Sequence, residues 1–267
     1  MIKISQFFLF LCLLFSSIVL AQSETQQAKM DQIVQESGID PTRNQSTVLY
    51  AFLVNTPKNS PIRMFNRFSG SVAVKDWTFT ARYDVTSIYL DKNDFQVGGF
   101  YTGLGDLRIS GQNTFFKKGK HALAAATEVL IPTAKSGYAF YGTSYFAFTP
   151  FLSYSVMPIL GTLFVIQSKY TFDVLRQPNT PALQLWVTRI FVAQFTRKGY
   201  FFVLEPRPIV DFTKKNCNFI MSSIIGKALG KGFNLLAMIE LPTSNKFWKE
   251  TGPTYQLMLN KSFTSKK

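Results

Sequence analysis

The chain has 267 residues, with 29 lysines and arginines against 15 acidic residues, which gives a formal net charge of +14 at neutral pH. Only 16% of its residues are charged and 46% are hydrophobic, a balance that excludes a disordered basic tail. One histidine and two cysteines offer little for a metal centre, and we expect neither a metal nor another cofactor.

The first 21 residues have the pattern of a secretory signal peptide. Lys3 precedes an apolar run from Phe7 to Phe15, and Ala21 ends the segment before polar residues begin. We expect cleavage after Ala21. Because export removes the chain from cytoplasmic nucleic acid, its excess of positive charge does not predict a nucleic-acid partner.

Residues 22–45 form a separate polar segment. A short helix over about 24–36 is expected, because Gly38 and Pro41 follow it as stop signals. Two interpretations stay open for this segment, a flexible linker and a plug or docking helix.

From Thr47 to the end of the chain, apolar and polar residues alternate with a period of two, which is typical of half-buried strands. Trp77 and Phe79, for example, alternate with Thr78 and Thr80. Twelve segments have this pattern: 46–56, 62–71, 77–90, 104–116, 121–131, 145–156, 160–173, 182–196, 199–211, 216–226, 232–241 and 253–263. Their lengths suffice for tilted strands to cross a bilayer.

The connections between these segments alternate in length. Those at 72–76, 117–120, 157–159, 197–198 and 227–231 are short, and the others are on average longer. Short turns on one rim and longer loops on the other are typical of an outer-membrane barrel. The expected short rim is rich in cations, which suit lipid phosphates but are also common in solvent-exposed turns: Lys75, Lys117, Lys118, Lys120, Arg197, Lys198, Lys227, Lys231, Lys266 and Lys267.

A spanning helix is the competing interpretation for residues 136–168, which contain no formal charge. Pro150 and Pro158 interrupt this stretch, and its polar and apolar residues alternate as in strands. A hairpin is therefore favoured, and the fold class predicted is all-β: an up-and-down antiparallel transmembrane β-barrel of about twelve strands over residues 46–267.

The alternation places ionic side chains on the face that would line the lumen. That set has more acidic than basic members, so we expect ion pairs alongside some excess negative charge: Arg82, Asp84, Asp106, Arg108, Glu128, Lys169, Asp173, Glu205, Arg207, Asp211 and Glu240. Arg189 does not fit, because it lies on an apolar face with Leu185, Val187, Phe191 and Ala193 that would meet lipid. Either the register of the strand shifts there or the residue lies near a membrane interface.

The segment Gly103-Leu104-Gly105-Asp106-Leu107, followed after one hairpin by Pro132-Thr133, resembles the outer-membrane family named for the meta-pathway of phenol degradation. The resemblance covers roughly residues 77–263, and it departs from the family pattern at Ala134, where a glycine is usual. It implies a barrel that passes small, often apolar or aromatic compounds, and it assigns no functional residues. Gly103 and Gly105 suit the start of a strand with positive φ, and a signature that fixes strand register is a simpler interpretation than a ligand site.

Catalysis has little support in the sequence. His121 is the only histidine, it lies beside a turn, and no serine stands within two residues of it. Asp84 and Asp106 have Arg82 and Arg108 close in sequence, which would keep both carboxylates ionised. We expect no enzyme activity, although a lipid-modifying enzyme and a non-conducting structural or surface-binding barrel stay open.

We therefore expect a passive channel for small solutes in the outer membrane of a Gram-negative bacterium, with Arg82, Asp84, Asp106, Arg108, Glu128, Lys169, Asp173, Glu205 and Arg207 lining the pore. The expected partners are outer-membrane lipid, the solute and, during biogenesis, the barrel-assembly machinery.

Overall fold

The computed structural model describes residues 24–58, 60–90, 98–134, 142–178, 180–244, 248–249 and 251–263. The expected signal peptide, residues 1–21, lies outside the described residues. Within them, no helix is long and apolar enough to span a membrane.

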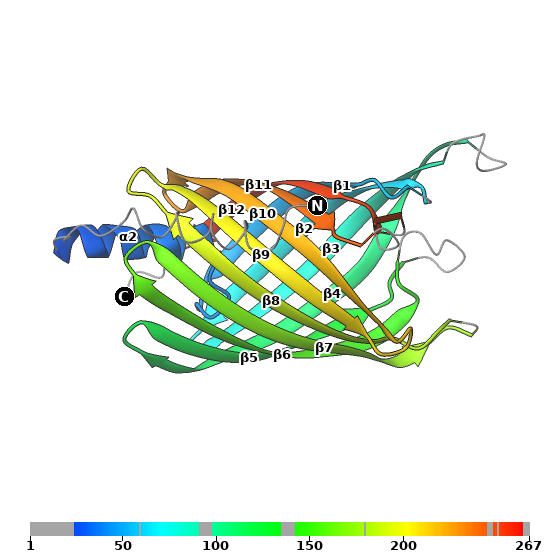
Figure 1. Ribbon diagram of the computed structural model, residues 1–267, viewed down its shortest axis with the longest axis horizontal. Helices are drawn as coiled ribbons and strands as arrows, with labels where there is room; N and C mark the ends of the chain where they lie inside the picture. Colours follow the sequence, from blue (N-terminus) through cyan, green and yellow to red (C-terminus); the bar gives the residue numbers. More distant parts are fainter. Residues whose placement is uncertain are drawn as a thin grey trace.

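The chain forms a closed barrel in which every strand pairs with its sequence neighbours in antiparallel fashion, and β1 pairs with β12 (Figure 1). This confirms the predicted twelve-stranded antiparallel barrel. The strands are β1 (Ser46–Asn55), β2 (Ile62–Val74), β3 (Trp77–Leu90), β4 (Gly99–Lys118), β5 (His121–Ile131), β6 (Tyr145–Ile159), β7 (Thr162–Arg176), β8 (Gln184–Phe195), β9 (Tyr200–Asp211), β10 (Asn216–Gly230), β11 (Phe233–Pro242) and β12 (Thr254–Phe263).

Most strand bounds agree with the sequence to within a few residues, and β4 differs most. It begins at Gly99, where φ is 131°, and pairs with Leu90 of β3 there. Gly103 and Gly105 therefore lie inside β4, and the prediction that they start the strand is wrong. The strand is longer because backbone pairing with β3 continues beyond the alternating segment.

The two rims differ as expected. The short turns lie on one rim, together with helix α2 (Glu24–Ser37), and the longer loops lie on the other (Figure 1). Lys231 and Gly232 between β10 and β11 both have positive φ, 51° and 77°, which is the geometry of a tight type I′ hairpin turn. We name these two ends the turn rim and the loop rim.

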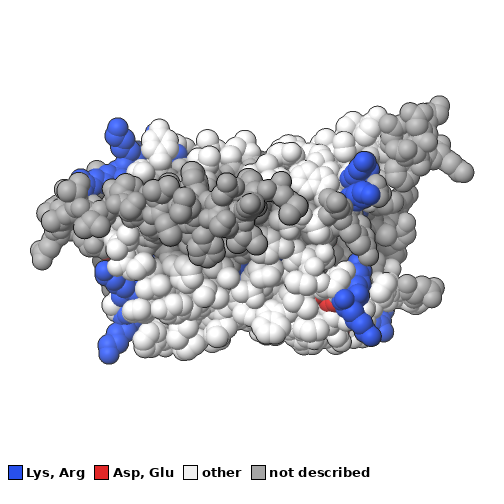
Figure 2. Space-filling view, viewed as in Figure 1, with Lys and Arg blue, Asp and Glu red and all other residues white. Residues whose placement is uncertain are grey.

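The outer wall is apolar between the rims. On the face seen in Figure 2, the visible lysines and arginines lie at the two ends of the barrel, with almost none on the uncovered part of the band between them. Exposed aromatic side chains occur near the turn rim (Trp77, Phe115, Tyr200, Phe233 and Phe263) and near the loop rim (Tyr89, Phe100, Trp186, Phe212 and Tyr255). An apolar band between two aromatic girdles matches the outer surface of a membrane barrel.

Helix α2 ends inside the barrel wall at the turn rim. Met30 and Val34 are buried among inward side chains that include Leu163, Ala193 and Phe201. Gly38, with φ of 69°, ends the helix, and the Ser37 hydroxyl donates a hydrogen bond of 2.7 Å to the Val34 carbonyl. The helix thus agrees with its predicted range and is docked through its last two turns.

Candidate functional site

Charged side chains from eight strands form a belt on the inner wall of the barrel. We name this set the charged belt: Arg67, Arg82, Asp84, Arg108, Glu128, Lys169, Arg189, Glu205, Arg207 and Glu240. Its carboxylates are engaged by arginines from neighbouring strands. Apart from Lys169, the belt therefore consists of ion pairs, most of them between strands, in which each partner offsets the desolvation of the other.

On the β2 to β5 side of the belt, two carboxylates hold three arginines. Arg67 makes two hydrogen bonds of 2.8 Å to Asp84, one to each carboxylate oxygen. Arg108 donates to Glu128 at 2.9 Å, and Arg82 lies 3.8 Å from the same carboxylate. Arg82 is therefore the more weakly held of the two arginines at Glu128.

Glu205 is the most enclosed carboxylate of the belt, with only 1% of its surface exposed. Arg189 donates to it at 2.6 and 3.0 Å, and Arg207 lies 2.8 Å away. Arg207 also contacts Glu240 at 2.8 Å. Glu205 thus joins β8 and β9, and Arg207 extends the same network to β11.

The position of Arg189 corrects a prediction. The apolar face of β8 that carries Arg189 points into the barrel, as the burial of Phe191 and Ala193 shows, and not toward lipid. The alternation of polar and apolar residues indicated the wrong face of β8, because the inner wall near the turn rim is also apolar. This part of the inner wall packs against α2. Arg189 therefore points into the barrel, where it forms an ion pair with Glu205.

The sign of the charge in the lumen is also different from the prediction. The belt contains six cations and four carboxylates, an excess of two positive charges, whereas an excess of negative charge was expected. Arg63 lies one inward position from Phe65 on the loop-rim side and has no ion pair among the described residues, so it raises the excess to three positive charges. The sequence prediction missed Arg63, Arg67 and Arg189, although the spacing of four between Arg63 and Arg67 already puts both on one strand face.

Three predicted lining residues lie at the loop rim instead, where they hold loops. Asp106 accepts hydrogen bonds from the Ala134 amide (3.3 Å) and from the amide (2.6 Å) and hydroxyl (2.8 Å) of Thr143. Asp173 accepts from the Leu183 amide at 2.7 Å, and Asp211 accepts from the Lys214 amide at 2.9 Å. These three carboxylates therefore accept hydrogen bonds from loop amides, and they do not belong to the charged belt.

The segment Gly103–Leu107 and the pair Pro132-Thr133, which carry the family resemblance, lie next to each other in the barrel. The Thr133 hydroxyl accepts from the Leu107 amide at 3.0 Å and donates to the Gly105 carbonyl at 2.9 Å, next to the contacts of Asp106 with the same loop. Thr243, which follows Pro242 at the end of β11, donates to the Phe219 carbonyl through its amide at 3.0 Å and through its hydroxyl at 3.2 Å. These contacts favour a structural role, in which the motif fixes the hairpin that follows Pro132.

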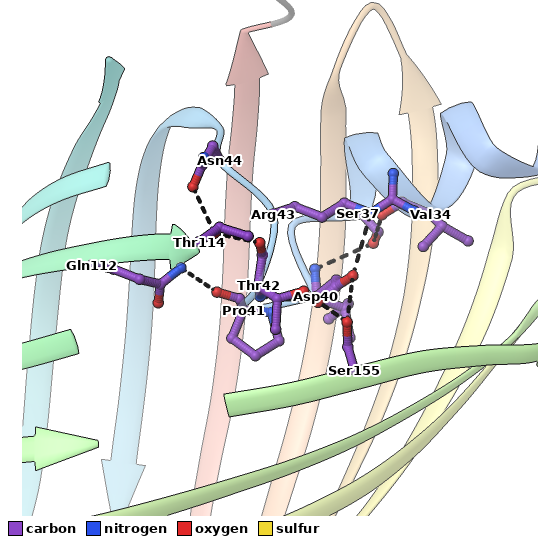
Figure 3. Close-up of polar contacts among 11 residues, drawn as sticks. Val34, Ser37, Asp40, Pro41, Thr42, Arg43, Asn44, Gln112, Thr114 and Ser155 are labelled. Atoms are coloured by element: carbon purple, nitrogen blue, oxygen red, sulfur yellow. Dashed lines mark hydrogen bonds and ion pairs between the residues drawn. The ribbon is translucent and has the colours of Figure 1, made fainter. Parts of the chain in front are cut away.

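The segment that follows α2 crosses the lumen at the turn rim. Asp40 accepts hydrogen bonds from the amide and hydroxyl of Thr42, and the Thr42 hydroxyl lies 2.7 Å from that of Ser155 on β6 (Figure 3). The Thr114 hydroxyl of β4 donates to the Thr42 carbonyl at 2.8 Å, and Gln112 donates to the Pro41 carbonyl. Residues 40–42 are thereby fixed to the β4 and β6 side of the barrel.

The other end of this segment is fixed on the opposite side. The Glu36 carbonyl accepts hydrogen bonds from Asn234 of β11 and, at 2.9 Å, from Ser262 of β12. In a ring of twelve strands, β6 and β12 face each other across the lumen. The chain from Glu36 to Thr42 therefore spans the barrel and narrows the lumen at the turn rim.

His121 is not part of the lumen site. Its side chain is exposed beside the turn at the start of β5, and its Nδ1 lies 2.7 Å from the hydroxyl of Tyr154. It also lines a small cavity of about 270 Å³ at the turn rim, together with residues that include Asp31, Asp40 and Ser155. Its hydrogen bond to a tyrosine hydroxyl is not the serine–histidine pair that a nucleophilic mechanism uses.

A cavity of about 630 Å³ lies between the crossing segment and the loop rim. Ser37, Gly38 and Ile39 form its base, and Asn55 and Thr254 lie toward the loop rim. One part of its wall belongs to the charged belt. The remainder combines apolar side chains, from strands that include β1, β10, β11 and β12, with neutral polar ones such as Thr171, Gln256 and Asn260. Its volume is in the range of small-molecule sites.

Comparison with solved structures shows similar barrels. An outer-membrane channel from Pseudomonas putida F1 has a TM-score of 0.63 at 8% identity, covering 85% of this chain and 98% of that one. The KdgM porin (TM-score 0.57, 7% identity) and the NanC porin (0.57, 8%) each cover 82% of this chain, which covers 99% of each. No family model and no curated protein matches the chain, so the resemblance to the meta-pathway family stays a prediction.

Replacement of Glu205 by Gln should destabilise the barrel. The substitution leaves Arg189 and Arg207 without the carboxylate that both contact, and breaking a buried ion pair costs roughly 3–5 kcal/mol. Denaturant unfolding in detergent, followed by tryptophan fluorescence, measures the change. Asp76→Asn removes a carboxylate from an exposed turn and should shift stability by less than about 0.5 kcal/mol. Equal stability of the two variants would contradict a structural role for the belt.

Replacement of Thr133 by Val should remove the two hydrogen bonds that the Thr133 hydroxyl makes to β4 and leave those of Asp106 with the same loop in place. We expect a loss of about 1–2 kcal/mol and faster proteolysis of the loop, because two backbone groups lose their partner. Thr127→Val, on the exposed outer face of β5, is the matched control. If the loop is cleaved at the same rate in both variants, the Thr133 hydroxyl does not hold the loop to β4.

Proposed function

We propose that the chain is an outer-membrane channel for small solutes, whose lumen is restricted at the turn rim by residues 30–42. The observation that carries the proposal is the contrast between its two walls. The outer wall is an apolar band between aromatic girdles, and the inner wall carries ion pairs around a cavity. Such a contrast suits a barrel with lipid outside and water inside.

The solved barrels of similar fold include porins and a channel, which supports transport over catalysis. In this proposal the turn rim faces the periplasm, and export by a cleaved signal peptide brings the chain to the outer membrane. The solutes are small, because the crossing segment and the belt side chains narrow the lumen.

For a solute to pass, the crossing segment, residues 36–42, must move out of the lumen. Four apolar side chains hold the segment together with several hydrogen bonds: Met30 and Val34 are buried, and Ile33 and Ile39 are half-buried. This set of contacts is modest, because each hydrogen bond contributes only about 1 kcal/mol net. The segment therefore suits a restriction that opens and closes more readily than the barrel unfolds.

Val34→Asp tests the proposal in planar lipid bilayers. A carboxylate at a fully buried position among apolar side chains should expel the segment, because an unpaired charge is costly to bury. We expect small, intermittent current steps from the unmodified chain and larger, longer openings from the variant.

Gln32→Asp, which adds the same charge on an exposed face of α2, is the matched control and should behave as the unmodified chain. A gel that compares boiled and unboiled samples verifies that each variant is folded. Absence of current from both the folded unmodified chain and the folded Val34→Asp variant would refute the channel and favour a non-conducting structural barrel.

A further inference from the structure

The cations of the charged belt are not all paired. Among the residues that the structure describes, Lys169 has no ion pair, and its ammonium group contacts only the ring of Phe151, 4.5 Å from the centroid. The Nε of Arg82 is buried without a hydrogen-bond partner, and the guanidinium reaches Glu128 at 3.8 Å. Two cations on the inner wall thus retain capacity for an anion.

Both of these side chains line the same cavity above the crossing segment. Glu240 is the one carboxylate among the described residues that line this cavity, and it is held by Arg207 at 2.8 Å. An anion that enters the cavity therefore meets Lys169, which has no ion pair among the described residues, and Arg82, which is only weakly paired, whereas a cation meets an excess of positive charge.

The uncharged part of the cavity wall contains an apolar group of side chains on β1, β11 and β12, beside polar ones such as Asn55, Thr254 and Gln256. Leu49, Leu53, Leu236, Met238 and Met258 face the cavity from β1, β11 and β12. They also belong to, or pack against, the apolar cluster that buries α2. A solute that fills this space thus contacts charge on one side and hydrocarbon on the other.

We propose that this cavity is a binding site for small organic anions with an apolar body, such as aromatic or medium-chain carboxylates. The carboxylate binds Lys169 and Arg82, and the apolar body lies against Leu236, Met238 and Met258. The inference rests on the proposed channel function and deepens it, because it names the class of solute that the lumen retains.

The cations and the apolar side chains of the cavity together disfavour molecules that lack either the negative charge or the apolar body. A neutral aromatic molecule gains the apolar contacts but leaves Lys169 and Arg82 without an anion. Acetate gains the charge contacts but covers little of the apolar wall, at a loss of burial for each missing methylene group. Benzylamine meets both cations with a charge of the same sign.

Isothermal titration calorimetry on the detergent-solubilised full chain tests the site directly. We expect hexanoate and benzoate to bind, acetate to bind at least about tenfold more weakly, and benzylamine not to bind. Benzoate binding should weaken as salt is added, since the contact is between charges. Equal affinity for benzoate and benzylamine would overturn the proposal.

Variants connect the binding to the named residues. Lys169→Gln should weaken benzoate binding by about tenfold, and Lys169→Arg should retain most of it. Met238→Gln should weaken hexanoate binding and leave acetate binding unchanged. Lys198→Gln, which removes an exposed turn-rim cation, is the control and should bind benzoate as the unmodified chain does.

Folding of each variant is verified by its migration before and after boiling, and Arg82→Gln replaces Lys169→Gln if the latter does not fold. Unchanged benzoate affinity in the folded variant would overturn the proposal. The calorimetric result is independent of conduction. Current in bilayers without benzoate binding refutes the site and leaves the channel, whereas binding without current in any variant refutes the channel and leaves the site.

Discussion

The whole structure depends on the need of every backbone amide and carbonyl group for a hydrogen-bond partner in an apolar surrounding. A sheet whose outer face is apolar cannot leave an open edge there, since each unpaired group costs several kcal/mol. The pairing of β1 with β12 removes both edges at once. Closure of the barrel also creates a lumen. The side chains and the segment that fill this lumen determine which solutes can enter it.

The interior is filled in two different ways along its length. Near the turn rim, small and apolar inward side chains such as Ala51 and Ala193 receive α2 and the segment after it. Farther toward the loop rim, the wall changes to ion pairs, and no segment of the described chain occupies the space between them. This change of chemistry from one end of the lumen to the other puts the cavity, its cations and its apolar wall in one place.

The number and approximate bounds of the strands could be predicted because alternation and turn residues are local properties of the sequence. The helix at residues 24–37 could be predicted for the same reason. Its docking could not, since the linker and plug interpretations differ only in contacts such as Thr42 with Ser155, which are 113 residues apart.

The candidate site was predicted in part. Arg82, Asp84, Arg108, Glu128, Lys169, Glu205 and Arg207 are brought together in the belt. Asp106 and Asp173 are not, because loop amides bind their carboxylates near the loop rim. Arg189 was assigned to the wrong face because both walls of β8 are apolar near the turn rim. Periodicity cannot then distinguish the inner face from the outer one.

Nitroxide spin labels on adjacent residues of β12 test the central claim most directly, namely that the outer wall faces lipid and the inner wall does not. In a Cys217→Ser background reconstituted into bilayers, a label at Leu257 lies on the outer wall, and one at Gln256 lies in the lumen. We predict that the label at Leu257 is far more accessible to dissolved oxygen than to a water-soluble nickel complex, and that the label at Gln256 lacks this preference. A label at Leu257 that is relaxed mainly by the nickel complex would contradict a membrane barrel.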